Sequence, residues 1–108
     1  MIDHKMIEEY ILGMPNAQLS YPFGESVAVY KAGDKMFALV AEGKEPVNLS
    51  LKCDPQLAET LREKYITVMP GYHLNKKHWN TLLLTGELPW DEVQALIRHS
   101  YDLVTNSK

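Results

Sequence analysis

Two strand-like runs joined by a short turn constrain the fold of this chain most. The runs span 27–31 and 36–41, and both consist largely of β-branched, aromatic and small apolar residues. Gly33-Asp34 lies between them, and glycine at the first central position favours a type II′ turn, whose twist matches that of paired strands. This register places Tyr30 opposite Phe37 and leaves apolar side chains on both faces of the hairpin. We therefore expect the hairpin to lie centrally in a sheet that is covered on both faces.

Helical patterns occupy both ends of the chain. Asp3 is a candidate N-cap, and apolar residues follow it at helical spacing as far as Met14. Pro89 precedes a longer stretch over 90–104, which has the apolar stripe of a helix that lies across a sheet. Between the two, Asp54-Pro55 predicts the start of a shorter helix, because aspartate caps free amides and proline suits the first turn.

The remaining segments have the patterns of strands and loops. Strand patterns occur at 47–52, 66–69 and 79–84. The first of them alternates between apolar and polar residues, as a strand with one solvated face does. Residues 16–25 are typical of an ordered loop, in which we expect Tyr21 and Phe23 to fill the edge of the core. Strands grouped between terminal helices indicate one α+β domain over 1–108, with a mostly antiparallel sheet packed against the N- and C-terminal helices.

The bulk properties are those of an ordinary soluble globular protein. The chain has 108 residues, 45% of them hydrophobic and 23% charged, which is enough to bury a core in one domain. Cys53 is the single cysteine, so no internal disulfide can form, and the N-terminus lacks the apolar core of a signal peptide. The longest apolar run, 36–41, is six residues and far too short to span a membrane. We therefore expect a monomeric cytoplasmic protein.

One segment, 70–84, is cationic and rich in hydrogen-bond donors. No acidic residue occurs between Glu63 and Glu87, whereas this interval contains three lysines. The whole chain has a net charge of −3, so removing the +3 of these lysines leaves −6 on the rest. The overall acidity argues mildly against a dedicated nucleic-acid binder, but the segment itself is suited to a polyanion.

Several short motifs, in order along the chain, together resemble those of one family of small bacterial proteins. The motifs are Tyr21-Pro22-Phe23-Gly24, Val29-Tyr30-Lys31, Lys35-Met36-Phe37-Ala38, Asn48-Leu49-Ser50-Leu51-Lys52-Cys53, Asn75-Lys76-Lys77-His78-Trp79-Asn80-Thr81 and His99-Ser100-Tyr101-Asp102-Leu103-Val104. They cover essentially the whole chain and resemble the MmcQ/YjbR family. The block that begins at Lys76 is the most specific of them.

This resemblance implies a fold and a role. The implied fold is CyaY-like and frataxin-like, an antiparallel sheet between N- and C-terminal helices. The implied role is DNA binding, which is a predicted property of the family. Frataxin-type proteins of this fold bind iron through an acidic first helix. Here Lys5 interrupts the acidic residues Asp3, Glu8 and Glu9, so the iron role does not carry over well.

If the 70–84 segment binds DNA, its side chains have recognisable tasks. Lysines would neutralise phosphates, asparagines would bond to sugar-phosphate or an adenine edge, and Tyr72 or Trp79 would stack on an exposed base. The hairpin turn at Gly33-Asp34 is a candidate wing. The predicted nucleic-acid-binding residues are Lys31, Lys35, His73, Asn75, Lys76, Lys77, His78, Trp79 and Asn80. The structural alternative is that Trp79 anchors the core, while His78 and Asn80 satisfy buried backbone groups or the Tyr101 hydroxyl.

Two other classes of function stay open. Tyr72, His78 and Tyr101 could line a small-molecule or enzymatic site between the sheet and the last helix, and Cys53 could be reactive or simply buried. The chain has no glycine-rich phosphate loop, metal-ligand quartet or nucleophile elbow, and His4 with Glu8 offers only two ligands. A protein-interaction module is the other class. We expect a non-enzymatic DNA-binding protein without cofactor or metal.

Overall fold

The computed structural model describes residues 2–71 and 74–106. Its helices are α1 (His4–Leu12), α2 (Pro55–Lys64) and α3 (Trp90–Thr105). Its strands are β1 (Ala17–Ser20), β2 (Val27–Ala32), β3 (Lys35–Ala41), β4 (Asn48–Lys52), β5 (Val68–Pro70) and β6 (Trp79–Leu83). The six strands form one antiparallel sheet in the order β1-β2-β3-β4-β6-β5. The predicted α+β class with an antiparallel sheet is therefore confirmed.

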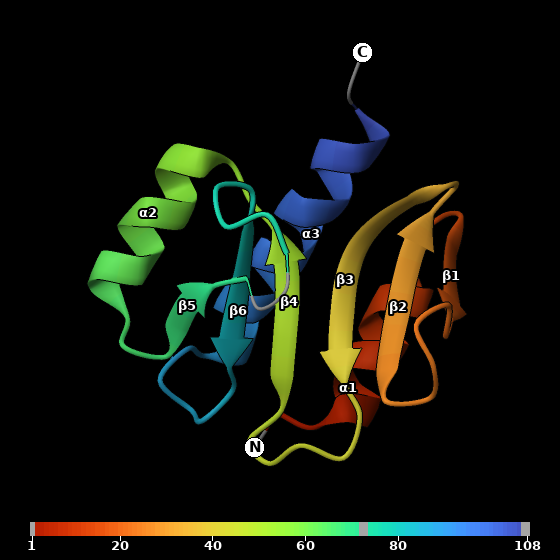
Figure 1. Ribbon diagram of the computed structural model, residues 1–108, viewed down its shortest axis with the longest axis horizontal. Coiled ribbons are helices and arrows are strands. Elements are labelled where there is room, and N and C mark those ends of the chain that lie inside the picture. Colours follow the sequence, from red (N-terminus) through yellow and green to blue (C-terminus); the bar gives the residue numbers. More distant parts are fainter. Residues whose placement is uncertain (1, 72–73, 107–108) are drawn as a thin grey trace.

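The helices are arranged around one side of this sheet. α1 and α3 lie behind the strands, and α2 flanks the β5 edge (Figure 1). The main core fills the space between sheet and helices, where Ile7 and Ile11 of α1 and Val93 and Ile97 of α3 are fully buried. None of the helices in the described ranges is long and apolar enough to cross a membrane.

Local capping chemistry accounts for where the first two helices begin. The Asp3 carboxylate accepts a 2.9 Å hydrogen bond from the Met6 amide. The Asp54 carboxylate accepts bonds of 3.1 Å from the amides of Gln56 and Leu57 at the start of α2. Both caps were predicted from the sequence, because an aspartate before a helix satisfies amides that have no intrahelical partner.

The central hairpin has the predicted turn but not the predicted register. Gly33 has a φ of 64° and Asp34 has no positive φ, as a type II′ turn requires. The register contains an irregularity beside Tyr30, which lies opposite Ala38 rather than Phe37. Phe37 is the extra residue of a β-bulge, so the predicted Tyr30–Phe37 pair is wrong. The bulge leaves Phe37 fully buried in the main core.

The two faces of this hairpin are covered in different ways. On the face away from α1 and α3, Val29, Leu39 and Trp79 form a second small core, with Leu74 packed against it. The cover on this face comes from the segment between β5 and β6, not from a helix. The expected burial of both hairpin faces is confirmed for these central residues.

The segment 16–25 departs from the prediction of a loop. Ala17–Ser20 form the edge strand β1, which pairs with β2 from Ala17 opposite Ala32 to Ser20 opposite Val29. Tyr21 and Phe23 do not fill the edge of the core, because they are 43% and 62% exposed. They follow the end of β1, where the backbone turns away from the sheet.

Ser100 of α3 joins the helix to the sheet at the point where β3 and β4 separate. Its side chain is fully buried, its Oγ accepts a 2.9 Å bond from the Lys52 amide, and its hydroxyl donates to the Phe37 carbonyl. The register that pairs Ala38 with Leu51 would next bring Phe37 opposite Lys52. The hydroxyl therefore bridges two backbone groups that the bulge keeps from pairing directly.

We predict that Ser100→Ala lowers the free energy of unfolding by roughly 1–3 kcal/mol, because it leaves the part-buried Lys52 amide and the buried Phe37 carbonyl without partners. Urea denaturation followed by circular dichroism measures the change. Thr105→Ala is the matched control, since it removes an exposed hydroxyl that bonds only within the same helix. Equal effects of the two substitutions would show that the bridge contributes nothing.

Candidate functional site

A pocket of about 470 Å³ opens at the end of the sheet where β4 finishes and β6 begins. It is lined by Lys52, Cys53, Asp54, Pro55, Asn75, His78, Trp79 and Leu103. These residues come from the junction of β4 and α2, from the segment between β5 and β6, and from the end of α3. Its size lies in the range of ordinary small-ligand sites.

Successive backbone amides fix one wall of this pocket. After the amide that Ser100 binds, the Cys53 amide donates to the His78 carbonyl at 2.8 Å. The Asp54 amide donates to His99 Nε2 at 3.1 Å. The His99 ring accepts through Nε2, so the proton of its neutral form is on Nδ1. The β4–α2 junction is thus held between α3 on one side and the start of β6 on the other.

Trp79 forms the floor of the pocket and belongs to the core. It is 8% exposed and packs with Val29 and Leu39. The backbone of Gly71 passes so close that a Cβ there would lie 2.7 Å from the Trp79 Cβ, and its amide donates to the Trp79 carbonyl at 2.8 Å. The buried ring offers no open face, so the predicted stacking of Trp79 on a base is corrected to the structural alternative.

Asn80 faces the opposite side of β6. Its side chain is 2% exposed, and Nδ2 donates a 3.3 Å bond to the Ala58 carbonyl of α2. The other amide atom, Oδ1, is buried and has no hydrogen-bond partner. A side chain in this position does not reach a ligand on the surface, so Asn80 leaves the predicted nucleic-acid set.

The two adjacent lysines of the segment have different surroundings. Lys76 Nζ donates a 3.2 Å bond to the Gly71 carbonyl, and the Lys76 carbonyl accepts a 2.8 Å bond from Arg62 of α2. Lys77 is exposed, and its amide donates to Asn75 Oδ1 at 2.9 Å. The Lys76 amine therefore binds a neutral carbonyl and not a carboxylate. Arg62, which the sequence did not single out, braces this segment.

Lysines of the sheet reach the same end from other strands. Lys31 lies opposite Met36, and Lys52 lies opposite Trp79, on the face that the helices leave open. Lys35 is exposed beside the hairpin turn. The basic end, as we name it, consists of Lys31, Lys35, Lys52, Arg62, Lys76 and Lys77. The acidic residues Asp34, Asp54 and Asp102 lie at the same end, and Glu59 and Glu63 flank Arg62 on α2.

Tyr101, another residue of the predicted small-molecule site, does not line the pocket. The Tyr101 hydroxyl donates to the Pro15 carbonyl, and its ring packs edge-on against Phe37 at 5.3 Å, in the layer between helices and sheet. Tyr72 and His73 lie outside the described residues. Of the two described members of the predicted small-molecule trio, His78 lines the pocket and Tyr101 does not.

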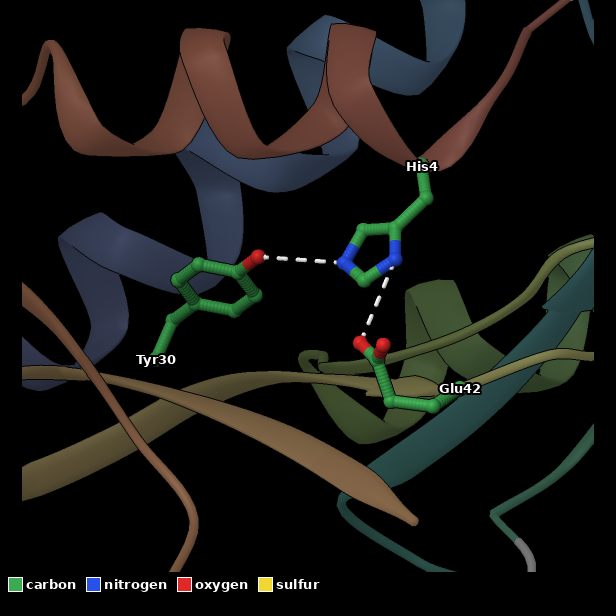
Figure 2. Close-up of polar contacts among 3 residues, drawn as sticks. All are labelled: His4, Tyr30 and Glu42. Atoms are coloured by element: carbon green, nitrogen blue, oxygen red, sulfur yellow. Dashed lines mark hydrogen bonds and ion pairs between the residues drawn. The ribbon is translucent and has the colours of Figure 1, made fainter. Parts of the chain in front are cut away.

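A second polar cluster joins α1 to the sheet. Figure 2 shows the His4 ring between the Tyr30 hydroxyl, 3.4 Å from Nε2, and the Glu42 carboxylate, 3.2 Å from Nδ1. The His4–Glu42 approach has the distance of an ion pair but not the alignment of a hydrogen bond, so Glu42 Oε1 has no donor. Burial, with the nearby charge of Glu8, raises the pKa of Tyr30 and keeps it neutral.

In this cluster the carboxylate beside His4 is that of Glu42, not that of Glu8, which the sequence offered as a possible second metal ligand. Only one carboxylate contacts the ring, and the described residues contain no group of three His, Cys, Asp or Glu side chains placed to hold a metal ion. The cluster therefore links α1 to Glu42, the residue that follows β3.

We predict that the His4 and Glu42 side chains stabilise the fold together. A double-mutant cycle of His4→Gln and Glu42→Gln, measured by urea denaturation, should give a coupling of roughly 0.2–1 kcal/mol, because the two side chains approach to 3.2 Å. The same cycle with Glu8→Gln in place of Glu42→Gln is the control and should give a smaller coupling. Equal coupling in the two cycles would contradict a specific His4–Glu42 contact.

Cys53 is a buried thiol. It is 4% exposed, and burial, with the Asp54 charge adding to it, raises the pKa of the thiol to about 11 although Arg62 opposes the shift. Both observations favour the buried alternative over the reactive one, because the thiolate is the nucleophilic form of cysteine.

We predict that Cys53 reacts with a thiol reagent such as DTNB at least about a hundredfold more slowly near pH 8 in the native protein than in denaturant. The two-unit rise of the pKa from 9.0 to about 11 alone reduces the thiolate fraction by about that factor. The native rate should increase as the pH rises towards 11. A native rate equal to the denatured rate would show an accessible thiolate.

Comparison with known proteins agrees with this fold. A family model described as YjbR matches residues 12–103. The chain belongs to the YjbR family. The match starts at the end of α1, so His4 lies outside it, whereas the pocket lining lies inside it.

Relatives and solved structures support the assignment. The uncharacterised protein YjbR of Escherichia coli K12 is 37% identical over 98 residues, covering 91% of this chain and 83% of the relative. The uncharacterised protein YbdF of Escherichia coli O157:H7 is 34% identical over 103 residues, covering 95% of this chain and 84% of its own.

The crystal structure of the Deinococcus radiodurans protein DR2400 superposes with a TM-score of 0.91 at 37% identity, covering 95% of this chain and 78% of that one. A Pseudomonas syringae crystal structure gives a TM-score of 0.81 at 29% identity, with coverages of 94% and 98%. These names state no activity, so membership of the YjbR family by itself assigns no function.

Proposed function

We propose that this YjbR-family protein binds nucleic acid, without catalysis, through the basic end of its sheet. The observation that carries the proposal is the convergence of cations from separate segments. Lys31 and Lys52 lie on the open face of the sheet, and Lys77 is exposed on the adjoining segment. Convergent lysines on one surface are the electrostatic signature of a phosphate-binding site.

The arrangement predicts weak, salt-sensitive binding. Each lysine that neutralises a phosphate releases counterions, and the logarithm of the affinity then falls with the logarithm of the salt concentration by ~0.9 per contact on a duplex and ~0.7 on a single strand. Only a few cations are available, and the net charge of the chain is −3. Binding is therefore measurable at low salt and largely lost at physiological salt.

The residues that the sequence predicted to contact bases are not placed to recognise a base sequence. Trp79 and Asn80 are buried, and Asn75 Oδ1 already accepts the Lys77 amide. Phosphate contacts by flexible lysines fix position and charge but carry no sequence information.

Fluorescence anisotropy with a labelled oligonucleotide over a salt series tests the proposal. We expect wild-type binding at about 50 mM salt, and Lys77→Ala should reduce the salt slope by ~0.7–0.9. Lys44→Ala is the matched control, because it removes the same charge from an exposed lysine in the loop between β3 and β4, at the other end of the sheet. Absence of binding at low salt, or equal slopes for the two variants, would overturn the proposal.

A second candidate, binding of a small molecule, is favoured by the pocket itself. It combines an apolar floor with polar groups on its rim, as small-ligand sites do. A shift of the melting temperature by a metabolite, lost when Leu103 is replaced by Trp, would support this candidate.

A further inference from the structure

Three polar side chains of the pocket have hydrogen-bonding groups that the fold does not use. The His78 ring, the Lys52 amine and Asn75 Nδ2 have no hydrogen-bond or ion-pair partner among the described residues. His78 and Lys52 are half-buried, and neither has a buried polar atom without a partner, so their polar atoms are open to solvent and to a ligand. All three residues line the same pocket, so their unused hydrogen-bonding groups are available to one ligand.

The apolar part of the lining lies on separate elements. Pro55 begins α2, Leu103 belongs to the end of α3, and Trp79 forms the floor. A planar ligand group between Pro55 and Leu103 would remove apolar surface of both from water. The His78 ring offers a surface on which a flat heterocycle can stack.

Other chemistry at this pocket is unfavourable. The high pKa of Cys53, caused chiefly by burial, leaves no thiolate for a nucleophilic step. The first amides of α2 donate to the Asp54 carboxylate, so the helix start has no free donors for an anion. Lys52 is therefore the cation of the lining, and a ligand with one negative group beside an apolar plane suits it.

We propose that this pocket binds one nucleotide, with its base between Pro55, Leu103 and His78 and its phosphate at Lys52. Lys52 belongs to both the pocket and the basic end, so a nucleic-acid strand held by the lysines would place one nucleotide at the pocket mouth. A base enters a pocket only when it is unpaired and unstacked, so the nucleic acid bound here is single-stranded. Binding of a nucleic-acid strand at this pocket rests on the proposed function. A free nucleotide has the same base and phosphate groups and would fit the same pocket.

Binding assays with three probes at about 50 mM salt separate these cases. The probes are a labelled single strand of about 12 nucleotides, the same strand annealed to its complement, and free AMP and TMP. We expect the single strand to bind roughly tenfold more tightly than the duplex, because a base–side-chain stack is added to the phosphate contacts.

Two pocket variants test where the preference arises. His78→Ala removes the stacking ring, and Leu103→Trp fills the cavity from α3. Each should reduce single-strand affinity to that of the duplex and leave the duplex affinity unchanged. Thr105→Trp adds the same bulk at an exposed position two residues further along and should change neither affinity. Circular dichroism confirms that each variant is folded.

Nuclear magnetic resonance gives a readout at the pocket itself. Trp79 lines the pocket, whereas Trp90 does not and packs edge-on against Tyr10 at 5.7 Å. Addition of AMP or of the single strand should shift the Trp79 indole signal and leave that of Trp90 in place.

Each outcome decides between the two proposals. Equal binding of single strand and duplex, or pocket variants that keep the preference, overturns the nucleotide pocket and leaves the proposed function standing. Binding of AMP or TMP at Trp79, with no binding of either oligonucleotide, overturns the proposed function and identifies a free nucleotide as the ligand. Absence of a Trp79 shift with every probe overturns the pocket proposal.

Discussion

Consecutive backbone amides at the end of β4 hold the pocket end of the sheet together. The amide of Lys52 is bound by Ser100, and the next two are bound by the His78 carbonyl and by His99. The Lys52 bond is part-buried and the Asp54 bond is exposed, so the first of these contributes more, because an amide removed from water without a partner is costly. α3 therefore does more than cover the core, because its polar residues set the path of the β4–α2 junction on which the pocket is built.

The bulge at Phe37 explains why a serine is needed at this point. The bulge leaves Phe37 without a partner across the hairpin and keeps its carbonyl from the Lys52 amide, and the Ser100 hydroxyl restores a bond to each. A hydroxyl is the smallest side-chain group that donates and accepts at once. The same displacement sends Phe37 into the core against Tyr101, so the helix, the bulge and the strand end form one packing solution.

The features that sequence predicted well are those that neighbouring residues decide. The Asp3 and Asp54 caps and the Gly33-Asp34 turn were visible because each rests on residues within a few positions. The register of the hairpin was not visible, because a bulge depends on contacts with a helix far along the chain.

At the site, the absence of acidic residues marked the cationic segment. Trp79 and Asn80 were misassigned because adjacent residues of a strand face opposite sides, and Lys52 was overlooked although its alternation with Leu51 placed it on the solvated face.

Positive and negative charges are distributed unevenly over this acidic chain. The net charge of −3 disfavours the approach of a polyanion over most of the molecule, whereas lysines of several segments lie at the basic end. Among them, the Lys76 amine binds the neutral carbonyl of Gly71 instead of a carboxylate. A polyanion would therefore approach at one end only and meet the pocket mouth first. Phosphate attraction by the lysines and admission of an unpaired base by the pocket would then be separate requirements, the first setting the salt dependence and the second setting which form of nucleic acid is held.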